Sequence, residues 1–438
     1  MTKVNPLILV GGQPIYNRHE SDSSIYYDTL ATALRTCGAR VGLLIDNLGE
    51  QTKYQQTPTY NSYSFQWIKQ AAKAKFGLWP RLSVRELPIS MIDLKHRDSP
   101  LPQIYRIFNG EGFTSYAEAV FSLSGKTTRI ILQEKVSAVH WASPVSMVVP
   151  GVPNLYTLHD LIPLQFPHLV PHRGAQWARL HQAVIKSADL IVSVSERCRE
   201  DICTILDVPE ARVANTYQPV SPLPVLDSEN AARLVRNVYC AKPFKYAFFC
   251  GPIEPKKNLY RLIDAFLMAD TDLQLLISGP LTSLYDDVLE IIAVSGARFV
   301  NSPGRAPVRW LGYLPRRHVL ALMQCARFFA FPSIYEGFGR PVVEAMQLGT
   351  PVLTSSGGSL PEIVGEAAQV TDPLDVAAMA AAVRRLADDN DLCTELARRG
   401  PAQAEKFSCE AYQRRLSAAY GKIDLHITHQ SLERDEIR

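Results

Sequence analysis

Short apolar runs that alternate with helical patterns along most of the chain constrain its fold more than any other feature. Ten runs of aliphatic, β-branched or aromatic residues are separated by segments with apolar residues at helical spacing. Strands that are apolar on both faces and alternate with helices are typical of parallel sheets built from βαβ units. The sequence therefore predicts an α/β fold with doubly wound, Rossmann-like sheets. The predicted strands are 7–10, 41–45, 139–142, 155–158, 190–194, 246–250, 273–278, 308–311, 328–331 and 351–354, with predicted helices that include 258–268 and 374–387.

A proline-rich stretch interrupts this alternation near the middle of the chain. Residues 213–230 contain the uncharged run Gln-Pro-Val-Ser-Pro-Leu-Pro from Gln218, which is typical of a linker. We therefore predict two domains, 1–222 and 240–410. Ligands of doubly wound sheets bind beyond the carboxyl ends of the strands. Two such domains that face each other are expected to hold a ligand in the cleft between them.

Composition limits the classes of partner. The chain has 46 basic and 43 acidic residues and a formal net charge of +3, which is too small for the basic face that nucleic acid requires. No apolar run reaches the ~18 residues of a membrane span, and residues 1–10 lack the pattern of a secretory signal. Eight scattered cysteines without a Cys-x-x-Cys pair indicate reduced thiols in a cytoplasmic protein. We predict neither a nucleic-acid partner nor a metal.

One segment departs from this even charge distribution. Residues 51–85 carry six basic residues and no acid. Five apolar residues, ending at Trp79, fall on one face of a predicted helix, and Lys69 and Lys73 fall on another. This pattern is typical of a helix on an anionic membrane surface and also of an amphipathic helix packed on its own domain. Two interpretations therefore stay open: residues 61–82 attach the protein peripherally to the inner face of a membrane, or they pack on their own domain.

The most informative stretch is 331–345, Phe-Pro-Ser-Ile-Tyr-Glu-Gly-Phe-Gly-Arg-Pro-Val-Val-Glu-Ala. It predicts a strand, a glycine-rich turn and a helix with Pro341 as its first residue. The N–H groups of 337–340 could cradle an anion with the help of the positive end of the helix. Glu344 is expected in the first turn, and Glu336 lies on the loop before it. Two carboxylates near a phosphate site suit sugar hydroxyls, although two solvated acids beside a tight turn would have the same spacing.

Two further segments place polar residues after predicted strands. Lys256 and Lys257 follow 246–250 and could neutralise phosphate as point charges, or they could belong to an ordinary charged turn. His159 ends the strand 155–158 and could meet a ligand held by the second half, or it could cap a loop. Spacing alone leaves both pairs of interpretations open.

Together these segments resemble family 4 of the retaining glycosyltransferases, whose GT-B fold consists of two Rossmann-like domains facing across a cleft. The resemblance is carried by Tyr-Thr-Leu-His-Asp from Tyr156, Glu-Pro-Lys-Lys-Asn from Glu254, the Glu-x7-Glu pair Glu336 and Glu344, and Gly-Ser-Leu-Pro-Glu from Gly358. It implies a metal-independent hexosyltransferase of polysaccharide biosynthesis, with mannose among the candidate sugars. The implied donor is a GDP- or UDP-sugar, and the implied acceptor is a glycan or lipid-linked glycan.

The resemblance also implies roles for individual residues. Lys257, with Lys256 beside it, would neutralise the donor diphosphate, and Glu344 would bind the ribose hydroxyls. Glu336 would bind the hydroxyls of the transferred sugar, and His159 would reach that sugar from the first domain. His159, Glu336 and Lys257 are thus the implied catalytic residues.

Main-chain groups complete the implied donor site. The amides of Gly337, Phe338 and Gly339 would hold the diphosphate or the sugar. Gly11 and Gly12, after the first predicted strand, would approach the phosphates from the first domain because they lack a Cβ atom. The nucleobase would rest near 310–314.

The chain also departs from the family pattern. Many members have an arginine shortly before the conserved lysine, where this chain has Pro-Ile-Glu at 252–254, and Arg340 stands where leucine is usual. A leaving diphosphate develops about two negative charges, and a helix end supplies roughly +0.5. We therefore expect Arg340 or Lys256 to supply the missing charge. The C-terminal helix, about 411–430, is expected to return to the first domain.

These departures keep other classes open. A non-catalytic nucleotide-sugar-binding subunit of a polysaccharide assembly complex would retain the fold with an altered phosphate site. A GT-B phosphorylase would release no nucleotide, and a sugar-nucleotide epimerase would need no acceptor.

Overall fold

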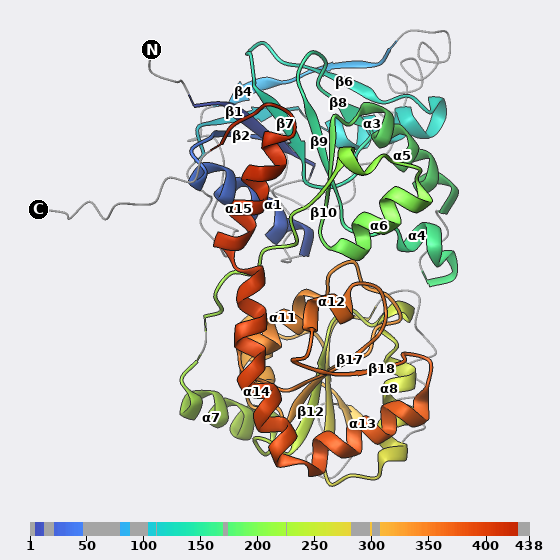
Figure 1. Cartoon of the computed structure of the whole chain (residues 1–438), viewed down its shortest axis with the longest axis vertical. Helices are drawn as coiled ribbons and strands as arrows, with labels where there is room; N and C mark the ends of the chain where they lie inside the picture. The colour runs from blue at the N-terminus through green and yellow to red at the C-terminus, as the bar shows by residue number, and fades with distance from the viewer. Residues whose placement is uncertain are drawn as a thin grey trace, which may run out of the picture.

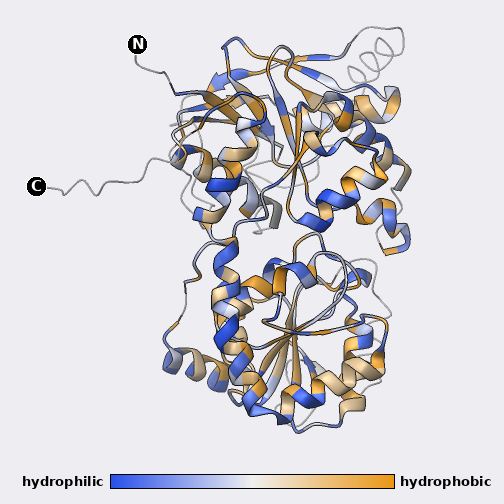
Figure 2. Cartoon of the chain, viewed as in Figure 1, coloured by the Kyte–Doolittle hydropathy of each residue, from blue (hydrophilic) through white to orange (hydrophobic). Residues whose placement is uncertain are grey.

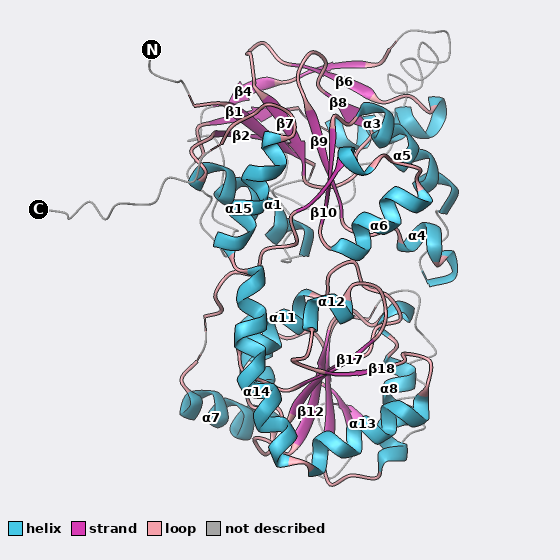
Figure 3. Cartoon of the chain, viewed as in Figure 1, coloured by secondary structure: helices cyan, strands magenta, loops and turns pink. Residues whose placement is uncertain are grey.

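The computed structural model describes residues 5–12, 22–46, 79–87, 104–110, 112–169, 174–224, 226–281, 298–299 and 307–427. These residues form two lobes, each with strands at its centre and helices around them (Figures 1 and 3). Within the described ranges, no helix combines the length and apolar character needed to cross a bilayer.

The first lobe contains an eight-stranded sheet in the order β11-β10-β9-β7-β1-β2-β5-β4. All neighbouring strands are parallel except β4 and β5. The chain builds outward from β1 to one side and then continues from β7 to the other, so β1 and β7 flank the switch point. The strands are β1 (Leu7–Gly11), β2 (Arg40–Ile45), β4 (Arg85–Leu87), β5 (Arg106–Asn109), β7 (Ala138–Trp141), β9 (Asn154–Leu158), β10 (Leu190–Ser193) and β11 (Val213–Asn215).

The second lobe contains a parallel seven-stranded sheet in the order β14-β15-β13-β12-β16-β17-β18. Here β12 and β16 flank the switch point. The strands are β12 (Tyr246–Cys250), β13 (Gln274–Ser278), β14 (Arg298–Phe299), β15 (Val308–Trp310), β16 (Phe328–Phe331), β17 (Val352–Ser355) and β18 (Gln369–Thr371). All ten strands predicted from the sequence are present in the two sheets, within about a residue at each end.

Helices connect and cover these strands (Figure 3). Side chains cap several N-termini, such as Ser195 before α6 and Asp375 before α13, because they satisfy N–H groups that have no partner within the helix. The helices of the first lobe are α1 (Asp22–Thr36), α3 (Phe113–Ser124), α4 (Ile162–Gln165), α5 (Gly174–Ser187) and α6 (Glu196–Ile205). The later helices are α7 (Ser228–Tyr239), α8 (Leu259–Ala269), α10 (Arg316–Gln324), α11 (Arg340–Gln347), α12 (Leu360–Val364), α13 (Val376–Asp388), α14 (Asn390–Ala404) and α15 (Cys409–Gly421).

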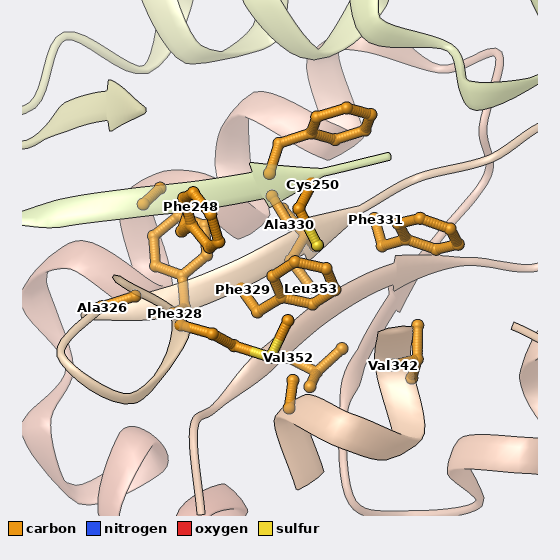
Figure 4. Packing of buried hydrophobic residues seen from close by; sticks show 14 of the residues in the cluster. Phe248, Cys250, Ala326, Phe328, Phe329, Ala330, Phe331, Val342, Val352 and Leu353 are labelled. Atoms are coloured by element: carbon orange, nitrogen blue, oxygen red, sulfur yellow. The ribbon is translucent and has the colours of Figure 1, made fainter. Parts of the chain in front are cut away.

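Buried apolar residues form a core in each lobe, and the strands are among the most hydrophobic parts of the chain (Figure 2). In the second lobe, Phe248, Phe328, Phe329 and Phe331 are completely buried and lie between the sheet and its helices (Figure 4). The rings of Phe329 and Phe331 stack with centroids 5.9 Å apart. Burial of such rings is a major stabilising contribution, so the second sheet is a rigid base for the loops that follow it.

The middle of the chain is more ordered than a linker. Val213–Asn215 forms β11, and Ser228–Tyr239 forms α7, whose Ala231 and Val235 are buried in the core of the second lobe. The prediction of a linker over 213–230 was therefore too long at both ends. The uncharged, proline-rich composition of this stretch had led to the prediction of a linker, although a short edge strand begins it and an amphipathic helix starts at its end.

The C-terminal helix crosses back to the first lobe (Figure 1). α14 runs along the second lobe, and α15 continues against α1, where Tyr412, Leu416 and Tyr420 are buried. Ser408 caps α15 by accepting a hydrogen bond from the N–H of Ala411. The two lobes are thus joined by two stretches of chain.

A small parallel sheet lies beside the first, with strand order β3-β6-β8: β3 (Arg81–Ser83), β6 (Thr128–Ile131) and β8 (Met147–Val148). The predicted helical face of 51–85 falls outside the described residues up to residue 78. Trp79 is described, and it precedes β3 rather than belonging to a helix. The prediction of a helical Trp79 is therefore wrong, because this end of the segment extends into a strand.

Candidate functional site

The predicted site residues gather where the switch points of the two sheets face each other. Lys257 follows β12, and Glu336 follows β16, the two strands that flank the switch point of the second sheet. Gly11 ends β1, and Gly12 follows it, beside the switch point of the first sheet. Doubly wound sheets bind ligands at this kind of position.

Lys257 and Glu336 form a buried ion pair. The Lys257 Nζ donates to Glu336 Oε1 at 2.6 Å, and each residue is only 8% exposed. The ammonium also lies 4.7 Å from the centroid of the Phe331 ring, a cation–π arrangement. Burial raises the pKa of the Glu336 carboxyl, but Lys257 and Lys256 more than offset this effect, so its pKa lies below the ordinary value. Glu336 is therefore ionised at neutral pH.

Neighbouring turns fix the position of this pair. The N–H of Ile334 donates to the carbonyl of Lys256 at 2.7 Å, and the Asn258 side chain donates to the carbonyl of Pro332 at 3.0 Å. On the other side, the N–H and hydroxyl of Ser359 donate to the carbonyl of Glu336 at 3.0 and 3.1 Å. The lysine turn, the loop after β16 and the Gly-Gly-Ser turn thus support one another.

Glu344 lies in a second charged cluster. It is 2% exposed; its Oε2 accepts a hydrogen bond from Arg316 Nη1 at 2.9 Å, and Arg316 Nη2 forms an ion pair with Oε1 at 2.5 Å. Arg340 Nε lies 3.0 Å from Oε1. The helix begins at Arg340, so Pro341 is its second residue and Glu344 starts its second turn rather than lying in the first. Arg340 thus contacts the carboxylate expected to bind ribose.

The glycine-rich turn touches the first lobe directly. A Cβ atom on Gly337 would lie 2.0 Å from the carbonyl oxygen of His159, so only glycine fits there. Gly339 has a φ of +91°, and a Cβ would lie 2.6 Å from Leu360 Cδ2. Phe338 points into the core, where its ring meets that of Phe407 at a centroid distance of 5.4 Å. The close approach of Gly337 to His159 and the left-handed backbone of Gly339 therefore explain why these two positions are glycine.

The first lobe contributes His159 and main-chain groups. His159 Nε2 lies 2.9 Å from the carbonyl oxygen of Ala142, which fixes the ring at the carboxyl ends of β7 and β9. The N–H of Ala142 donates to the carbonyl of Gly11 at 2.8 Å, and Ser143 Oγ donates to the carbonyl of Gly12 at 3.2 Å. The structure thus brings Gly11, Gly12 and His159 to one edge of the sheet, with Gly337 against the last of them.

A buried polar network connects His159 to the C-terminal helix. The Tyr26 ring meets His159 edge to face at a centroid distance of 4.8 Å. Its hydroxyl lies 2.9 Å from Thr157 Oγ1 and accepts from the Tyr412 hydroxyl at 3.2 Å. His140 bonds Thr157 Oγ1 through Nε2 at 2.9 Å and the hydroxyl of Tyr420 through Nδ1 at 3.0 Å. Burial, which is the main cause, and the nearby His159, which is the second, lower the pKa of His140 to about 3.

Further polar contacts join the lobes. Glu362 Oε2 accepts from the N–H of Glu196 at 3.1 Å, and Oε1 accepts from that of Arg197 at 2.9 Å. A carboxylate at the N-terminus of α6 complements the helix dipole. The Tyr335 hydroxyl donates to Asp201. Both contacts escaped the sequence analysis because each joins residues more than 130 positions apart.

The remaining predicted residues lie at the rim of this arrangement. Lys256 Nζ is 3.9 Å from a Glu254 oxygen, so an acid already opposes its charge. The loop proposed for the nucleobase closes on β13, since the N–H of Gly279 donates to the carbonyl of Gly312 at 2.9 Å and Trp310 Nε1 donates to that of Gly279 at 3.2 Å. Within the described ranges, no three histidine, cysteine or acidic side chains lie together as metal ligands would.

Arg316 is the main site residue that the sequence analysis missed. It stands beside Arg317 after Pro315, and spacing does not distinguish the two arginines. Only the fold shows that the first contacts Glu344, 28 positions away, whereas the second is exposed.

Comparison with solved structures defines the class of fold. The HepE protein of Anabaena, solved in complex with UDP and glucose, aligns over 95% of this chain and 100% of its own, with a TM-score of 0.62 and 16% identity. WaaG, a glycosyltransferase of lipopolysaccharide biosynthesis, aligns over 94% and 98% with a TM-score of 0.56 and 14% identity. The two-domain α/β architecture is the GT-B fold.

Sequence relatives define the family. The family model "Glycosyl transferases group 1" matches residues 238–403, and "Glycosyltransferase Family 4" matches 92–222. O-antigen chain mannosyltransferase B of Escherichia coli is 34% identical over 58% of this chain and 66% of its own length. The serotype-specific mannosyltransferase WbdA of the same species is 29% identical over 76% of this chain, which spans 42% of that longer protein. The chain belongs to the group 1, family 4 glycosyltransferases.

Proposed function

We propose that this protein is a retaining glycosyltransferase that moves a hexose, with mannose as the first candidate, from a nucleotide-diphosphate sugar to a glycan in polysaccharide biosynthesis. The observation that carries the proposal is the contact between Gly337 and His159, which brings the Lys257–Glu336 pair beside the switch point of the first sheet. Mannose is favoured because several relatives are named mannosyltransferases.

The charged groups support a leaving-group role for the second domain. A departing nucleoside diphosphate gains negative charge, and fixed cations and amides stabilise that charge without reorganisation. Lys257 and the arginines around Glu344 are positioned for this purpose, and they support the metal-independent form of the proposal. His159 and Glu336 would orient the sugar from its two sides. In this proposal orientation and charge stabilisation supply most of the rate enhancement.

The first experiment separates this proposal from its alternatives. GDP-, UDP- and ADP-sugars are screened by thermal shift with EDTA present, since a ligand that binds only the folded state raises the melting temperature. The stabilising donor is then incubated with lipid-linked glycan acceptors. We expect nucleoside diphosphate and a product that retains the donor's anomeric configuration. Binding without transfer or hydrolysis would favour the non-catalytic subunit, and release of a free epimerised sugar nucleotide would favour an epimerase.

A cationic and aromatic face supports a lipid-linked acceptor at a membrane surface. Trp79 is 45% exposed, and the Arg129 guanidinium and Lys126 ammonium lie 4.5 and 5.6 Å from its ring centroid. Arg81 of β3 lies opposite Arg129 of β6 in the strand register, so both side chains are on the same face of the sheet. Tryptophan with cations suits an anionic lipid interface. We expect Trp79→Ala to weaken sedimentation with anionic vesicles but not with neutral ones. Equal sedimentation of the variant and the unaltered protein with anionic vesicles would contradict the proposal of a membrane surface.

A further inference from the structure

Two arginines contact Glu344 in the candidate donor site. On the other side of the glycine-rich turn, Lys257 faces Glu336 and Lys256 faces Glu254. Around Glu344, two guanidiniums face one carboxylate. An incoming diphosphate therefore finds two guanidinium groups beside Glu344, one of which already holds a carboxylate.

We propose that Arg316 is a diphosphate-binding residue that supplies the charge absent from 252–254. The proposal rests on the function proposed above and adds to it a residue and a ligand group. When the donor binds, the Arg316 guanidinium leaves the Glu344 carboxylate and donates its hydrogen bonds to the phosphate oxygens instead. Glu344 then becomes available to the ribose hydroxyls that the family resemblance assigns to it.

Exposure distinguishes Arg316 from the other members of the cluster. Its side chain is 37% exposed, whereas those of Arg340 and Glu344 are 11% and 3% exposed. Arg316 is therefore the cation that solvent, and hence a ligand, can reach. Arg340 is four positions before Glu344 on the same helix and remains beside the carboxylate after an exchange, so Glu344 does not become an unpaired buried charge.

The chemistry of the two ligands makes the exchange reasonable. Carboxylate and phosphate both accept the two parallel N–H bonds of a guanidinium, which is why arginine serves either anion. Both terminal nitrogens of Arg316 already face the two oxygens of Glu344, one in a hydrogen bond and the other in an ion pair. Its backbone is held at the start of α10 by a loop tied to β13, where Ser278 Oγ donates to the carbonyl of Gly312 at 3.1 Å. The side chain can therefore change partner without movement of the sheet.

The neighbouring arginine provides a matched control. Arg317 is exposed on the same turn of α10, so Arg317→Gln removes the same charge from the protein without touching the cluster. Isothermal titration of UDP, GDP and ADP first identifies the nucleotide that the unaltered protein binds. The same titration, together with the corresponding nucleoside, is then applied to Arg316→Gln, Arg316→Lys and Arg317→Gln.

We expect Arg316→Gln to weaken binding of the diphosphate about 10- to 100-fold, the order expected for loss of hydrogen bonds to a charged group. Arg316→Lys should lie between it and the unaltered protein, because an ammonium keeps the charge but not the fork. Arg317→Gln should remain within about two-fold. Binding of the nucleoside should change little in all three variants, and melting temperatures without ligand show that each variant is folded.

Two results would overturn the inference while the proposed function stands: equal binding of the diphosphate by Arg316→Gln and the unaltered protein, or an equal loss for diphosphate and nucleoside. The second result would show that Arg316 acts only through Glu344. If the unaltered protein binds none of the three diphosphates, the proposed function fails and the inference fails with it.

Discussion

Two buried polar networks, one in each domain, meet at the junction and are built from different chemistry. The second domain uses ions: Lys257 with Glu336, and two arginines with Glu344. The first domain uses neutral groups: His140, Thr157 and three tyrosine hydroxyls that extend to the C-terminal helix. Apart from the Arg316 side chain, which is 37% exposed, the members of both networks are largely buried, so the difference does not arise from burial.

The difference is explained by what each network is expected to meet. Buried ion pairs are costly to form and are weak evidence for stability, so a cluster of them is more readily explained by a charged ligand. A neutral network orients side chains without attracting an anion, and full satisfaction of its donors and acceptors makes it rigid. We infer that the second domain supplies charge and that the first supplies geometry.

Removal of the lysine gives the largest effect that this comparison predicts. Lys257→Met should lower kcat/KM about 10²- to 10³-fold, the range for loss of one stabilising group at the reacting centre. It should also lower the free energy of unfolding by about 3–5 kcal/mol, because Glu336 is left buried without its partner. Transfer kinetics and urea unfolding measure the two effects.

A double variant separates them. Lys257→Met combined with Glu336→Gln removes both charges, so most of the stability should return while activity stays lost. Lys256→Met is the matched control, with a smaller loss of activity, because the Lys256 side chain lies at the rim and is 20% exposed, compared with 10% for Lys257. If the double variant regains activity along with stability, the ion pair is structural and the comparison between the domains fails.

Contact between the two networks can be tested at Gly337. A Cβ there would lie 2.0 Å from the His159 carbonyl oxygen, so Gly337→Ala must separate the domains slightly. A displacement of about 1 Å can cost as much as 100-fold in rate, and we expect kcat/KM to fall about 10- to 100-fold. Nucleotide affinity should change less than about three-fold, since the donor is held by the second domain.

Gly421→Ala is the control for this prediction, because a Cβ on Gly421 would meet nothing within 4 Å. Its kinetics and nucleotide affinity should match those of the unaltered protein. If Gly337→Ala instead lowers affinity as much as it lowers kcat/KM, the two domains share the donor more evenly than we propose.

The sequence was sufficient for the fold because apolar periodicity and strand length are local properties. It also placed Lys257 and Glu336 near each other, since each follows a strand of the second sheet and parallel strands end at a common edge. His159 follows a strand of the first sheet, and its place opposite the second sheet was expected from the cleft between two such domains. The short edge strands β11 and β18 carry too few residues to produce a period. The uncharged, proline-rich stretch before α7 indicated a linker, so the start of the second domain could not be placed from the sequence.

The partners of the charged residues were beyond the reach of the sequence. Arg340 could be placed near a phosphate by its position after Gly339, but its proximity to Glu344 depends on the exact start of α11. Arg316 reaches the same carboxylate from another helix, and Tyr26 reaches His159 from α1. Such contacts depend on how elements far apart in the chain pack together.

The smallest predicted effect concerns His140 and tests whether the network of the first domain is neutral. The pKa of this imidazole is lowered to about 3 by burial and by His159, whereas an unfolded histidine titrates near 6.5. Between these values the unfolded chain binds a proton that the folded chain excludes, so stability must fall as the pH drops below about 6.5. From pH 7.5 to 5.5 this loss amounts to about 1.4 kcal/mol.

Urea unfolding at the two pH values measures this loss as a difference between proteins. His140→Gln has no titrating imidazole, so its stability should fall by about 1.4 kcal/mol less than that of the unaltered protein. His426→Gln, at an exposed position, is the matched control for the histidine-to-glutamine change itself. If His140→Gln and the unaltered protein lose the same stability, His140 is protonated in the folded state, and the first domain also carries a buried charge. Charge would then be common to both networks, and the assignment of donor binding to the second domain would depend on Arg316 and Lys257 alone.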